Sequence, residues 1–324
     1  MRDVGPVNSK SPISYPIPPL PRIAILTDDP GWHGKQLCFA FAERGYQAEY
    51  VSLTACKLQL TVTGLPVVIP GFERELPAAV FVRGVPGGSL EEVVFYLDIL
   101  HALKLMGVPV YNDAGAIERS VDKGMTSFLL QRAGLPTAMT WVLRDRDEAL
   151  AVAEQQLREG HFLISKPLFG SQGEGIRRIE KSTDLLWLTS SRGIYYLQRF
   201  VRCQGDGYSD LRVFVINGKA VAGMRRRGIS WLNNVARGAA CEYVDVEPGL
   251  ALLAIAAVSA LRMDYAGVDV ILDADGIYRV IEVNSVPAWK GLQSVCDVNI
   301  ADLLAADLLE RYCETSEPCL AVSN

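Results

Sequence analysis

The chain has 324 residues, of which 49% are hydrophobic and 21% are charged, as is usual for a folded globular protein. This length suits about two to three domains, and the composition excludes a wholly disordered, collagen-like or low-complexity protein. Its 32 Lys and Arg residues against 37 Asp and Glu residues give a net charge of −5, so no large positive field indicates binding to nucleic acid or to an anionic membrane.

Cysteine and histidine usage narrows the class of protein further. The seven cysteines are scattered without a Cys-x-x-Cys pair, which argues against a disulfide framework or a zinc site, and we expect reduced thiols. Three histidines leave little material for a histidine-based metal centre. The longest apolar stretch, residues 250–261, is shorter than the roughly 20 residues that a membrane span requires. Residues 1–20 lack the apolar region of a signal peptide and are expected to form a flexible leader, so we expect a cytoplasmic protein without a membrane partner.

Strands and helices alternate in the first third of the chain. The predicted strands are residues 21–27, 46–53, 78–83 and 108–111, and the predicted helices are one that ends at residue 43 and one over 90–106. This alternation implies a parallel α/β sheet over residues 21–115. Gly87 and Gly88 follow a strand, where such sheets tend to bind ligands, although a plain connector is the simpler interpretation.

The pattern changes after residue 115. A small α+β unit over residues 116–193 is predicted from helices at 117–133 and 146–159 and strands at 140–143, 162–166 and 176–179. Residues 194–312 contain two antiparallel hairpins. One hairpin turns at Asn217-Gly218, a strong type I′ signal, and the other turns at residues 273–276. We expect residues 313–324 to be a tail.

A glycine-rich loop follows the strand that ends at Lys166. Residues 166–175 read Lys-Pro-Leu-Phe-Gly-Ser-Gln-Gly-Glu-Gly. Glycine lets backbone amides approach phosphate oxygens, and a lysine supplies a positive charge to them. The loop lacks the Gly-Lys-Ser/Thr ending of a Walker A motif, so a phosphate-binding loop and a flexible hairpin turn both remain open.

The second hairpin carries three oxygen-bearing side chains. If residues 273–276 form a four-residue loop, Asp269 pairs with Val280, and strand alternation places three residues on one face of the sheet: Asp269, Glu282 and Asn284. The opposite face then carries the apolar residues Val268, Val270, Ile281 and Val283, whose burial fixes the register. Hard oxygen ligands suit Mg²⁺, so the spacing favours a metal site over a solvated polar face.

Five motifs occur in the order and spacing of the ATP-grasp fold. They are Asp122-Lys123 at the start of a helix, Phe162 to Pro167, Gln198 to Val201, Asp210 to Val215, and Gly267-Val268-Asp269 with Glu282-Val283-Asn284. The collection resembles the RimK-like branch of ATP-grasp enzymes, whose members attach glutamate or another amino acid to a carboxylate. The resemblance covers roughly residues 21–310 and implies an N-terminal parallel α/β domain, a small α+β lid domain and a C-terminal antiparallel-sheet domain.

The resemblance also implies roles for individual residues. Lys123 and Lys166 are similar to the two lysines that reach the ATP phosphates, and Arg199 and Phe200 occupy the hinge that holds adenine, where the family usually has an acidic residue in place of Arg199. The implied ATP-binding residues are Lys123, Lys166, Gly170, Ser171, Gly173, Gln198, Arg199, Phe200, Asp210, Arg212 and Asn233. The implied ligands of Mg²⁺ or Mn²⁺ are Asp269, Glu282 and Asn284, and the implied catalytic residues are Arg226, Asn234 and Arg237.

Arg226 corresponds to an arginine near the transferred phosphoryl group, but the sequence leaves open on which face of its strand the side chain lies. A simple register from the Asn217-Gly218 turn places Arg212, Arg225 and Arg227 on one face and Arg226 on the other. Either the face of Arg226 meets the site or a bulge intervenes.

Two departures from the family concern the acceptor pocket. Leu232 stands where the family has an arginine, and Ala288 stands where it has a glycine. One charge fewer puts the family's usual substrate in doubt. We expect an acceptor pocket of Trp231, Leu232, Trp289 and Lys290, which suits a small aromatic or heteroaromatic carboxylate, although core packing is at least as common for tryptophan.

These features predict an ATP-dependent carboxylate–amine ligase. It would add glutamate or another amino acid to a small-molecule carboxylate through an acyl phosphate, releasing ADP and phosphate, and a homo-oligomer is left open. Two alternatives remain: an ATP-grasp kinase of small molecules, and a nucleotide-binding regulatory protein without ligase activity. The intact lysines and metal-site residues favour an active enzyme over the regulatory protein.

Overall fold

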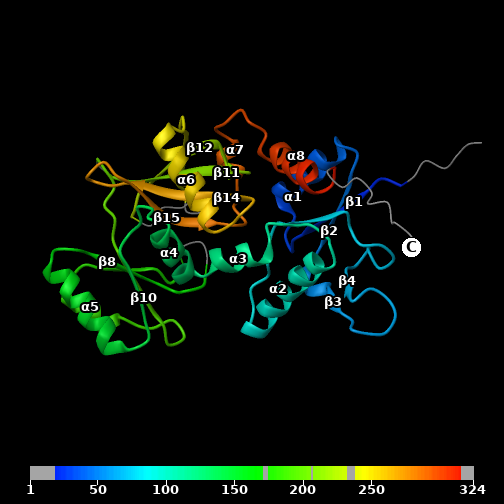
Figure 1. Cartoon of the computed structure of the whole chain (residues 1–324). Coiled ribbons are helices and arrows are strands. Elements are labelled where there is room, and N and C mark those ends of the chain that lie inside the picture. Colours follow the sequence, from blue (N-terminus) through cyan, green and yellow to red (C-terminus); the bar gives the residue numbers. More distant parts are fainter. Residues whose placement is uncertain (1–18, 171–173, 206, 232–237, 315–324) are drawn as a thin grey trace, which may run out of the picture.

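The computed structural model describes residues 19–170, 174–205, 207–231 and 238–314. They form a parallel sheet with its helices, a four-stranded central sheet and a five-stranded C-terminal sheet (Figure 1). The predicted α/β fold class, with a parallel N-terminal α/β part, a small α+β part and a C-terminal antiparallel sheet, is therefore confirmed. No helix in this part of the chain combines the length and the apolar character that crossing a bilayer demands.

The N-terminal sheet is parallel, and three of its four strands are almost completely buried. In spatial order the strands are β2 (Gln47–Val51), β1 (Arg22–Leu26), β5 (Ala79–Val82) and β6 (Val110–Tyr111), and the helices are α1 (Gly31–Ala42) and α2 (Leu90–Leu105). Ile23 and Ile25 pack on the side of α1, whereas Ala24 and Leu26 pack on the side of α2. A short ribbon of β3 (Lys57–Leu58) and β4 (Val67–Val68) follows a 3₁₀ turn, η1 (Leu53–Ala55), and none of these three was predicted.

The helix predicted over residues 117–133 is two helices, α3 (Ala114–Val121) and α4 (Lys123–Arg132). Asp122 separates them with an extended backbone, φ −83° and ψ 101°. Its Oδ1 accepts hydrogen bonds from the backbone N–H groups of Gly124 (2.8 Å) and Met125 (3.0 Å), so Asp122 is the N-cap of α4. The predicted helix start at Asp122-Lys123 is therefore correct, and the single continuous helix is wrong.

The central sheet is antiparallel and is covered by one helix. Its order is β7 (Thr140–Leu143), β10 (Tyr195–Arg199), β8 (Leu163–Lys166) and β9 (Arg177–Ile179), with α5 (Arg146–Arg158) packed on it through Ala149 and Ala153 and with a 3₁₀ turn, η2 (Ser182–Trp187), beside it. β10 belongs to this sheet, so the chain passes to the C-terminal sheet after Arg199 rather than at residue 194.

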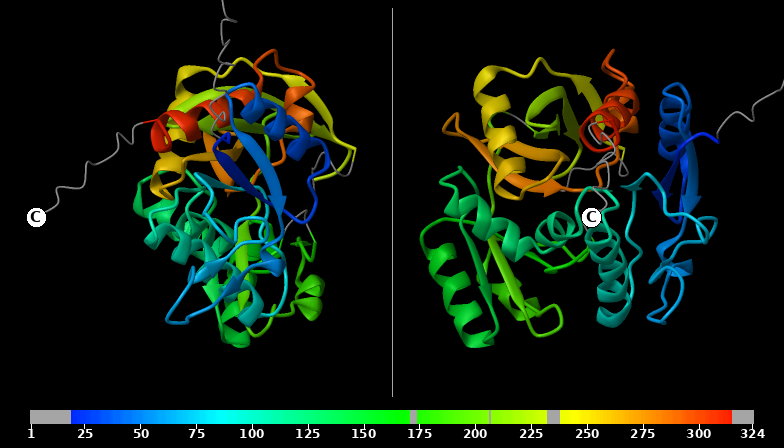
Figure 2. Two further views of the ribbon diagram at one scale, coloured as in Figure 1. Left: turned by 90° about the vertical axis from the view of Figure 1, so that its right-hand side faces the viewer. Right: turned by 45° about the vertical axis from the view of Figure 1, so that its right-hand side comes forward.

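The C-terminal sheet lies over the central sheet in Figure 1. Its order is β13 (Ala240–Tyr243), β12 (Lys219–Gly228), β11 (Tyr208–Ile216), β14 (Tyr265–Leu272) and β15 (Tyr278–Asn284), and the helices are α6 (Pro248–Ala260), α7 (Lys290–Gln293) and α8 (Ile300–Tyr312). α6 covers one face, while α8 lies beside α1 of the N-terminal domain in Figures 1 and 2. α8 therefore joins the N-terminal domain and the C-terminal sheet in one core.

A β-bulge sets the face on which Arg226 lies. Asn217 (φ 47°) and Gly218 (φ 68°) form the predicted two-residue turn between β11 and β12. The register shifts between Phe214 and Val215, where Val221 is the extra residue, and beyond it Arg226 lies opposite Asp210. Of the two possibilities left open for Arg226, the bulge is the correct one.

A second bulge corrects the predicted pairing of β14 with β15. Val270 pairs with Val280, and Asp269 then pairs with Glu282 rather than with Val280. Ile281 is the extra residue, so Val280 and not Ile281 fills the buried face. The pairing of two completely buried valines explains the shift, because both must face the core beneath α6. The prediction that Asp269, Glu282 and Asn284 share a face is confirmed.

Asn112 links the N-terminal domain to the C-terminal sheet. This fully buried side chain follows β6, and its Nδ2 donates to the carbonyl oxygens of Tyr265 (2.7 Å) and Ser285 (2.8 Å). Its Oδ1 accepts a hydrogen bond from the backbone N–H of Asp264 (2.8 Å). Asn112 thereby fixes the ends of β14 and β15, which carry the candidate metal ligands, against the N-terminal domain.

Candidate active site

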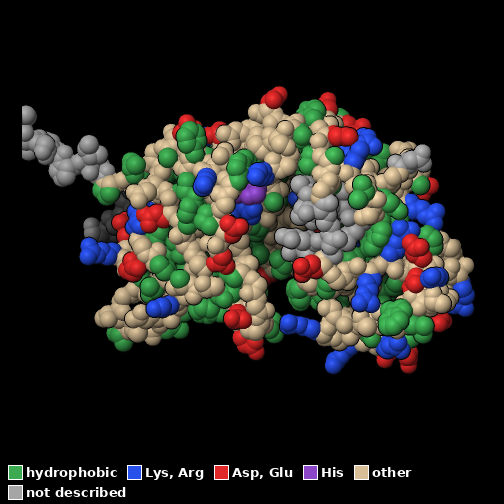
Figure 3. All heavy atoms as spheres, turned by 180° about the vertical axis from the view of Figure 1, so that it is seen from behind, with side chains coloured by type: hydrophobic (Ala, Val, Ile, Leu, Met, Phe, Trp, Pro, Cys, Tyr) green, Lys and Arg blue, Asp and Glu red, His purple; other side chains and the backbone are tan. Residues whose placement is uncertain are grey.

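A cavity of about 710 Å³ lies between the central and the C-terminal sheet and reaches the N-terminal domain. Figure 3 shows a hollow near the middle of one face of the molecule, bordered by side chains of both charge signs. Most of the described residues predicted for the site line this cavity. They are Lys123, Lys166, Gly170, Gln198, Arg199, Phe200, Asp210, Arg212, Arg226, Trp231, Asp269, Glu282, Asn284 and Lys290.

Two lysines contribute positive charge from the central unit. Lys123 is the first residue of α4, and its Nζ donates a hydrogen bond to the carbonyl oxygen of Gly170 (2.7 Å). Lys166 ends β8, and its Nζ donates to Oε1 of Gln198 (2.7 Å). Burial lowers the pKa of both lysines, that of Lys166 to about 8 although Glu282 attracts its charge. Both ammonium groups are thus partly desolvated and lie where an anion would stabilise them.

Gln198 orients Lys166 from a buried position. Its Nε2 donates to Oγ1 of Thr140 (3.0 Å) and to the hydroxyl of Tyr196 (3.1 Å), which leaves Oε1 to accept from Lys166. The side chain is 2% exposed. Gln198 therefore orients the Lys166 ammonium, and its contact with ATP stays a prediction.

Asp269 holds two arginines on the floor of the cavity. Arg212 donates to both oxygens of the Asp269 carboxylate at 2.6 and 2.7 Å, and Nη2 of Arg226 lies 3.0 Å from Oδ2. Burial alone would raise the pKa of Asp269, but the charges of Arg212 and Arg226 outweigh it and lower the pKa to about 2. Asp269 is thus ionised across the physiological pH range.

Asp210 fixes the other side of the Arg226 guanidinium. Nε of Arg226 lies 2.5 Å from Oδ1 of Asp210, and Arg226 is 5% exposed. Burial raises the pKa of Asp210 to about 6 in spite of the nearby Arg226 charge. Arg226 is therefore held between two carboxylates in one orientation.

The oxygen donors on this face fit a hard divalent cation. Among the described residues, the Glu282 carboxylate has no hydrogen bond or ion pair, and Asn284 uses its Nδ2 for a 3.4 Å contact with the carbonyl oxygen of Gly267. The carbonyl oxygen of Asn284 and the carboxylate of Glu282 are thus left to bind a ligand. Within the described parts of the chain no group of three His, Cys, Asp or Glu residues could hold a metal. The predicted metal site therefore depends on the Asn284 amide and on Asp269, whose carboxylate also binds the two arginines.

The hinge between the two sheets provides an apolar wall. Arg199 does not point its charge into the cavity, because its guanidinium donates to Oε1 of Gln156 at 2.9 and 2.6 Å and pairs with Glu159 at 3.6 Å. Phe200 follows it, with its backbone N–H bonded to the carbonyl oxygen of Phe162 (2.8 Å). The apolar residues that line the cavity near this end of the sheets are Ile164, Val201, Ile271 and Ile281.

Of the residues expected in the acceptor pocket, Trp231, Trp289 and Lys290 are described, and they do not all line the cavity. Trp231 lines the cavity beside the hinge, with its ring edge-on to Phe200 at a centroid distance of 6.2 Å. Trp289 does not line the cavity: it is 1% exposed and packs on His33 (4.6 Å) and Phe214 (6.2 Å). Core packing, the common arrangement of tryptophan, explains this difference from the expectation. Lys290 is exposed and lines the cavity.

Six predicted site residues lie outside the described residues. They are Ser171, Gly173, Leu232, Asn233, Asn234 and Arg237.

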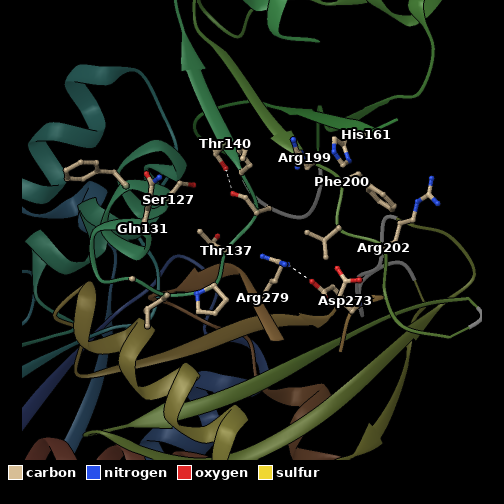
Figure 4. A pocket seen from close by; sticks show the side chains of 18 of the residues that line it. Ser127, Gln131, Thr137, Thr140, His161, Arg199, Phe200, Arg202, Asp273 and Arg279 are labelled. Atoms are coloured by element: carbon tan, nitrogen blue, oxygen red, sulfur yellow. Dashed lines mark hydrogen bonds and ion pairs between the residues drawn. The ribbon is translucent and has the colours of Figure 1, made fainter. Parts of the chain in front are cut away.

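A second cavity of about 780 Å³ lies on the other side of the hinge and is shown in Figure 4. Its labelled residues include Ser127, Gln131 and Thr137, and an ion pair of 2.5 Å joins Arg279 to Asp273. Neither Lys123 nor Lys166 lines it. The charged residues that suit a nucleotide thus border the first cavity.

Comparison with known proteins agrees with this geometry. Residues 120–308 match the RimK-like ATP-grasp domain, and residues 22–117 match the RimK PreATP-grasp domain. The chain belongs to the RimK-like ATP-grasp family. It is an ATP-dependent ligase that forms an amide from a carboxylate and an amine, and this family uses ATP and Mg²⁺.

Two relatives and one solved structure illustrate the likeness. The tetrahydromethanopterin:alpha-L-glutamate ligase of Methanocaldococcus jannaschii is 37% identical over 238 residues, covering 71% of this chain and 78% of the relative. The probable alpha-L-glutamate ligase 2 of Hahella chejuensis is 30% identical over 288 residues, covering 85% and 91%. The ATP-grasp ligase PsnB complexed with minimal precursor has a TM-score of 0.70 at 21% identity, covering 90% of this chain and 99% of that chain, which shows the ATP-grasp fold.

Sequence reasoning missed Arg83, which this ligase contributes to the cavity from its N-terminal domain. Arg83 directly follows the fully buried strand β5. β5 and β1 are neighbours in the order β2-β1-β5-β6. The strand that follows β1 in sequence, β2, lies on one side of this pair, and the strand that follows β5, β6, lies on the other. Ligands of open α/β sheets bind at such a switch point, outside the carboxyl ends of the strands. A charged residue immediately after an apolar strand was the available signal.

Proposed function

We propose that this ligase transfers the γ-phosphoryl group of ATP to a carboxylate of a small-molecule acceptor and then joins the acyl group to the amino group of glutamate. The observation that carries the proposal is a single cavity with Lys123 and Lys166 on one wall and Asp269, Glu282 and Asn284 on the other. The names of the relatives from Methanocaldococcus jannaschii and Hahella chejuensis support glutamate as the amine substrate.

The two ends of the cavity suit the two ends of a nucleotide. The apolar residues near the hinge would contact the base, and the lysine ammonium groups would pair with the phosphates. Glu282, Asn284 and one oxygen of Asp269 would hold Mg²⁺, which when bound neutralises charge on the phosphates.

Arg226 is the residue best placed to stabilise the transferred phosphoryl group. Asp210 and Asp269 fix its guanidinium before any substrate binds, so little reorganisation is needed during the reaction. An acceptor carboxylate oxygen attacks the γ-phosphorus, the bond to the β-phosphate oxygen breaks, and ADP leaves. The amine then attacks the acyl carbon, loses a proton and expels phosphate. No step requires a protein nucleophile, since positioning and charge stabilisation supply the catalysis.

The acceptor can be identified by product analysis. Relatives from three methanogens are named tetrahydromethanopterin:alpha-L-glutamate ligases, so a pterin-linked carboxylate is the first acceptor to test. The purified protein is incubated with Mg-ATP, labelled glutamate and either this acceptor or a cell extract, and products are analysed by mass spectrometry. We expect a small molecule that gains a glutamyl residue, and ADP release that requires both acceptor and glutamate.

Three other results would contradict the proposal. ADP release with acceptor but without glutamate would indicate a small-molecule kinase. Tight nucleotide binding without turnover of any acceptor would indicate a regulatory protein. Labelling of a protein alone in the extract would exclude a small-molecule acceptor.

A further inference from the structure

Arg83 and Lys290 form the end of the cavity that faces the N-terminal domain. Arg83 lies at the carboxyl end of β5, and Lys290 is the first residue of α7, shortly after the proposed metal ligand Asn284. Both side chains line the cavity. They are thus placed beyond the phosphate-binding lysines, on the side where a second substrate would enter.

Arg83 has no carboxylate partner within hydrogen-bond distance among the described residues. Its Nε is buried without a hydrogen-bond partner, and its one hydrogen bond is a long contact from Nη1 to the carbonyl oxygen of Val286 at 3.4 Å. Its Cζ lies 5.3 Å from the centre of the Trp289 ring. Burial lowers the pKa of Arg83, and the more distant Tyr265 and Asp29 offset this only in part. A partly buried guanidinium with unused donors is costly unless a ligand supplies an anion.

His33 shows that Arg83 and Lys290 surround one region. Nε2 of His33 accepts hydrogen bonds from the backbone N–H groups of Trp289 (3.1 Å) and Lys290 (3.2 Å), so the imidazole is neutral. Burial, followed by the charges of Arg83 and Lys290, lowers its pKa to about 4. The histidine therefore fixes the backbone of Lys290 without adding a charge, and the two cations are left to face an anion together.

We propose that Arg83 and Lys290 bind the carboxylates of the amino-acid substrate, so that the N-terminal domain selects an acidic amine donor. The inference rests on the proposed function and names its subsite. The guanidinium fork of Arg83 can bind one carboxylate through two hydrogen bonds, and the Lys290 ammonium can pair with the other. Glutamate brings two carboxylates that do not react, whereas the reacting carboxylate of the acceptor must lie at the γ-phosphate. The nucleotide phosphates already have Lys123 and Lys166.

The test is calorimetric titration of L-glutamate into the protein loaded with Mg²⁺ and the non-hydrolysable ATP analogue AMP-PNP. We expect Arg83→Gln to weaken glutamate binding by about 10- to 100-fold, as for loss of a charge-assisted hydrogen bond, with AMP-PNP affinity changed less than about threefold. Lys290→Gln should have a smaller effect in the same direction, because its side chain is exposed. Arg83→Lys should retain part of the affinity, since it keeps the charge and loses the fork.

Matched controls separate binding from folding. Arg74→Gln removes an exposed arginine of the same domain that does not line the cavity, and it should leave glutamate affinity unchanged. In thermal unfolding without ligands, Arg83→Gln should be at least as stable as the wild type, because it removes a partly buried charge. The stabilisation that glutamate confers on the loaded wild type should be lost in this variant.

The possible failures are distinguishable. Equal glutamate affinity in the wild type and Arg83→Gln would overturn this assignment and leave the proposed function intact. An increased KM for the acceptor with unchanged glutamate affinity would also overturn it. Absence of glutamate binding to the loaded wild type would overturn the proposed amine donor and the subsite with it.

Discussion

Arg212 and Asp269 lie directly opposite each other on β11 and β14, and two hydrogen bonds of 2.6 and 2.7 Å join their side chains. Arg226 contacts the same carboxylate at 3.0 Å. Two nearly buried guanidinium groups therefore share the Asp269 carboxylate at the point where the phosphates are expected, and Arg226 pairs with Asp210 as well. The structural role of Asp269 can be measured separately from catalysis, because loss of a buried ion pair lowers the free energy of unfolding as well as the turnover.

Asp269→Asn should destabilise the fold and abolish activity. Without the carboxylate charge, Arg212 and Arg226 stay buried and under-compensated, so we expect the free energy of unfolding to fall by about 3–5 kcal/mol in urea titrations at neutral pH. Adding Arg212→Met should restore part of the stability but no activity. A loss below about 1 kcal/mol would contradict the proposed charge balance.

The same aspartate predicts the acid limb of the stability curve. Its pKa is about 2 in the folded protein, below the 3.8 that is ordinary for an aspartate, so its stabilising contribution is complete above pH 3.8 and is lost as the pH falls through about 2. Asp269→Asn should therefore show a flatter dependence of unfolding free energy on pH between about 4 and 2. If the unfolding free energy of the variant falls with pH as steeply as that of the wild type, the acid loss of stability comes from other carboxylates.

Glu282→Gln tests the metal site. The substitution removes one formal charge and nearly preserves shape, so we expect ADP release to fall by about 100-fold or more while the unfolding temperature stays near that of the wild type. The control is Glu75→Gln, an exposed glutamate that does not line the cavity. Near-normal turnover of a folded Glu282→Gln protein would exclude Glu282 as a metal ligand.

Lys166 predicts an alkaline loss of nucleotide affinity. Burial lowers the pKa of Lys166 from 10.5 to about 8, so the unliganded protein carries the ammonium below about pH 8 and loses it above. Binding of AMP-PNP should be constant below pH 7 and should weaken by up to about tenfold per pH unit above 8. The unfolding free energy should change in the opposite direction, since the cost of burying the charge disappears as the pH rises from 8 to 10.5. In Lys166→Arg the alkaline loss of affinity should vanish.

Trp231→Ala distinguishes the nucleotide end of the cavity from the acceptor end. Trp231 contacts Phe200 edge-on at 6.2 Å, so we expect its loss to raise the dissociation constant of ATP by about three- to tenfold and to leave the KM of the acceptor nearly unchanged. Trp187→Ala, at a tryptophan that is 69% exposed, is the control. A selective increase in the acceptor KM would instead place Trp231 in the acceptor pocket, as the sequence suggested.

The fold and the charged face were accessible from sequence because local signals determine them. Strand–helix alternation predicts the parallel sheet, the Asn217-Gly218 turn predicts its hairpin, and alternation along the second hairpin predicts the shared face of Asp269 and Glu282. The break at Asp122 was hidden, because helical periodicity continues through a capping residue.

The remaining errors concern contacts between distant segments. The sequence around Trp289 does not distinguish a tryptophan that lines a pocket from one that packs on His33, which is 256 residues away. The pairing of β14 with β15 depends on which valine meets the core beneath α6, which alternation alone cannot decide. Arg83 could be placed in the cavity only once the strand order put β5 next to β1.

The bulge at Ile281 gives β15 a property that a regular strand lacks. Successive residues of a strand normally face opposite sides, yet Ile281 and Glu282 both line the cavity while Val280 and Val283 are buried. Two consecutive residues, one apolar and one anionic, therefore face the same cavity. A ligand that is itself amphiphilic, with a flat ring and a metal-bound polyanionic tail, can meet both at once. Deleting Ile281 would keep the pairing of Asp269 with Glu282 and would remove the apolar side chain next to the carboxylate, so the length of β15 determines which side chains face the cavity.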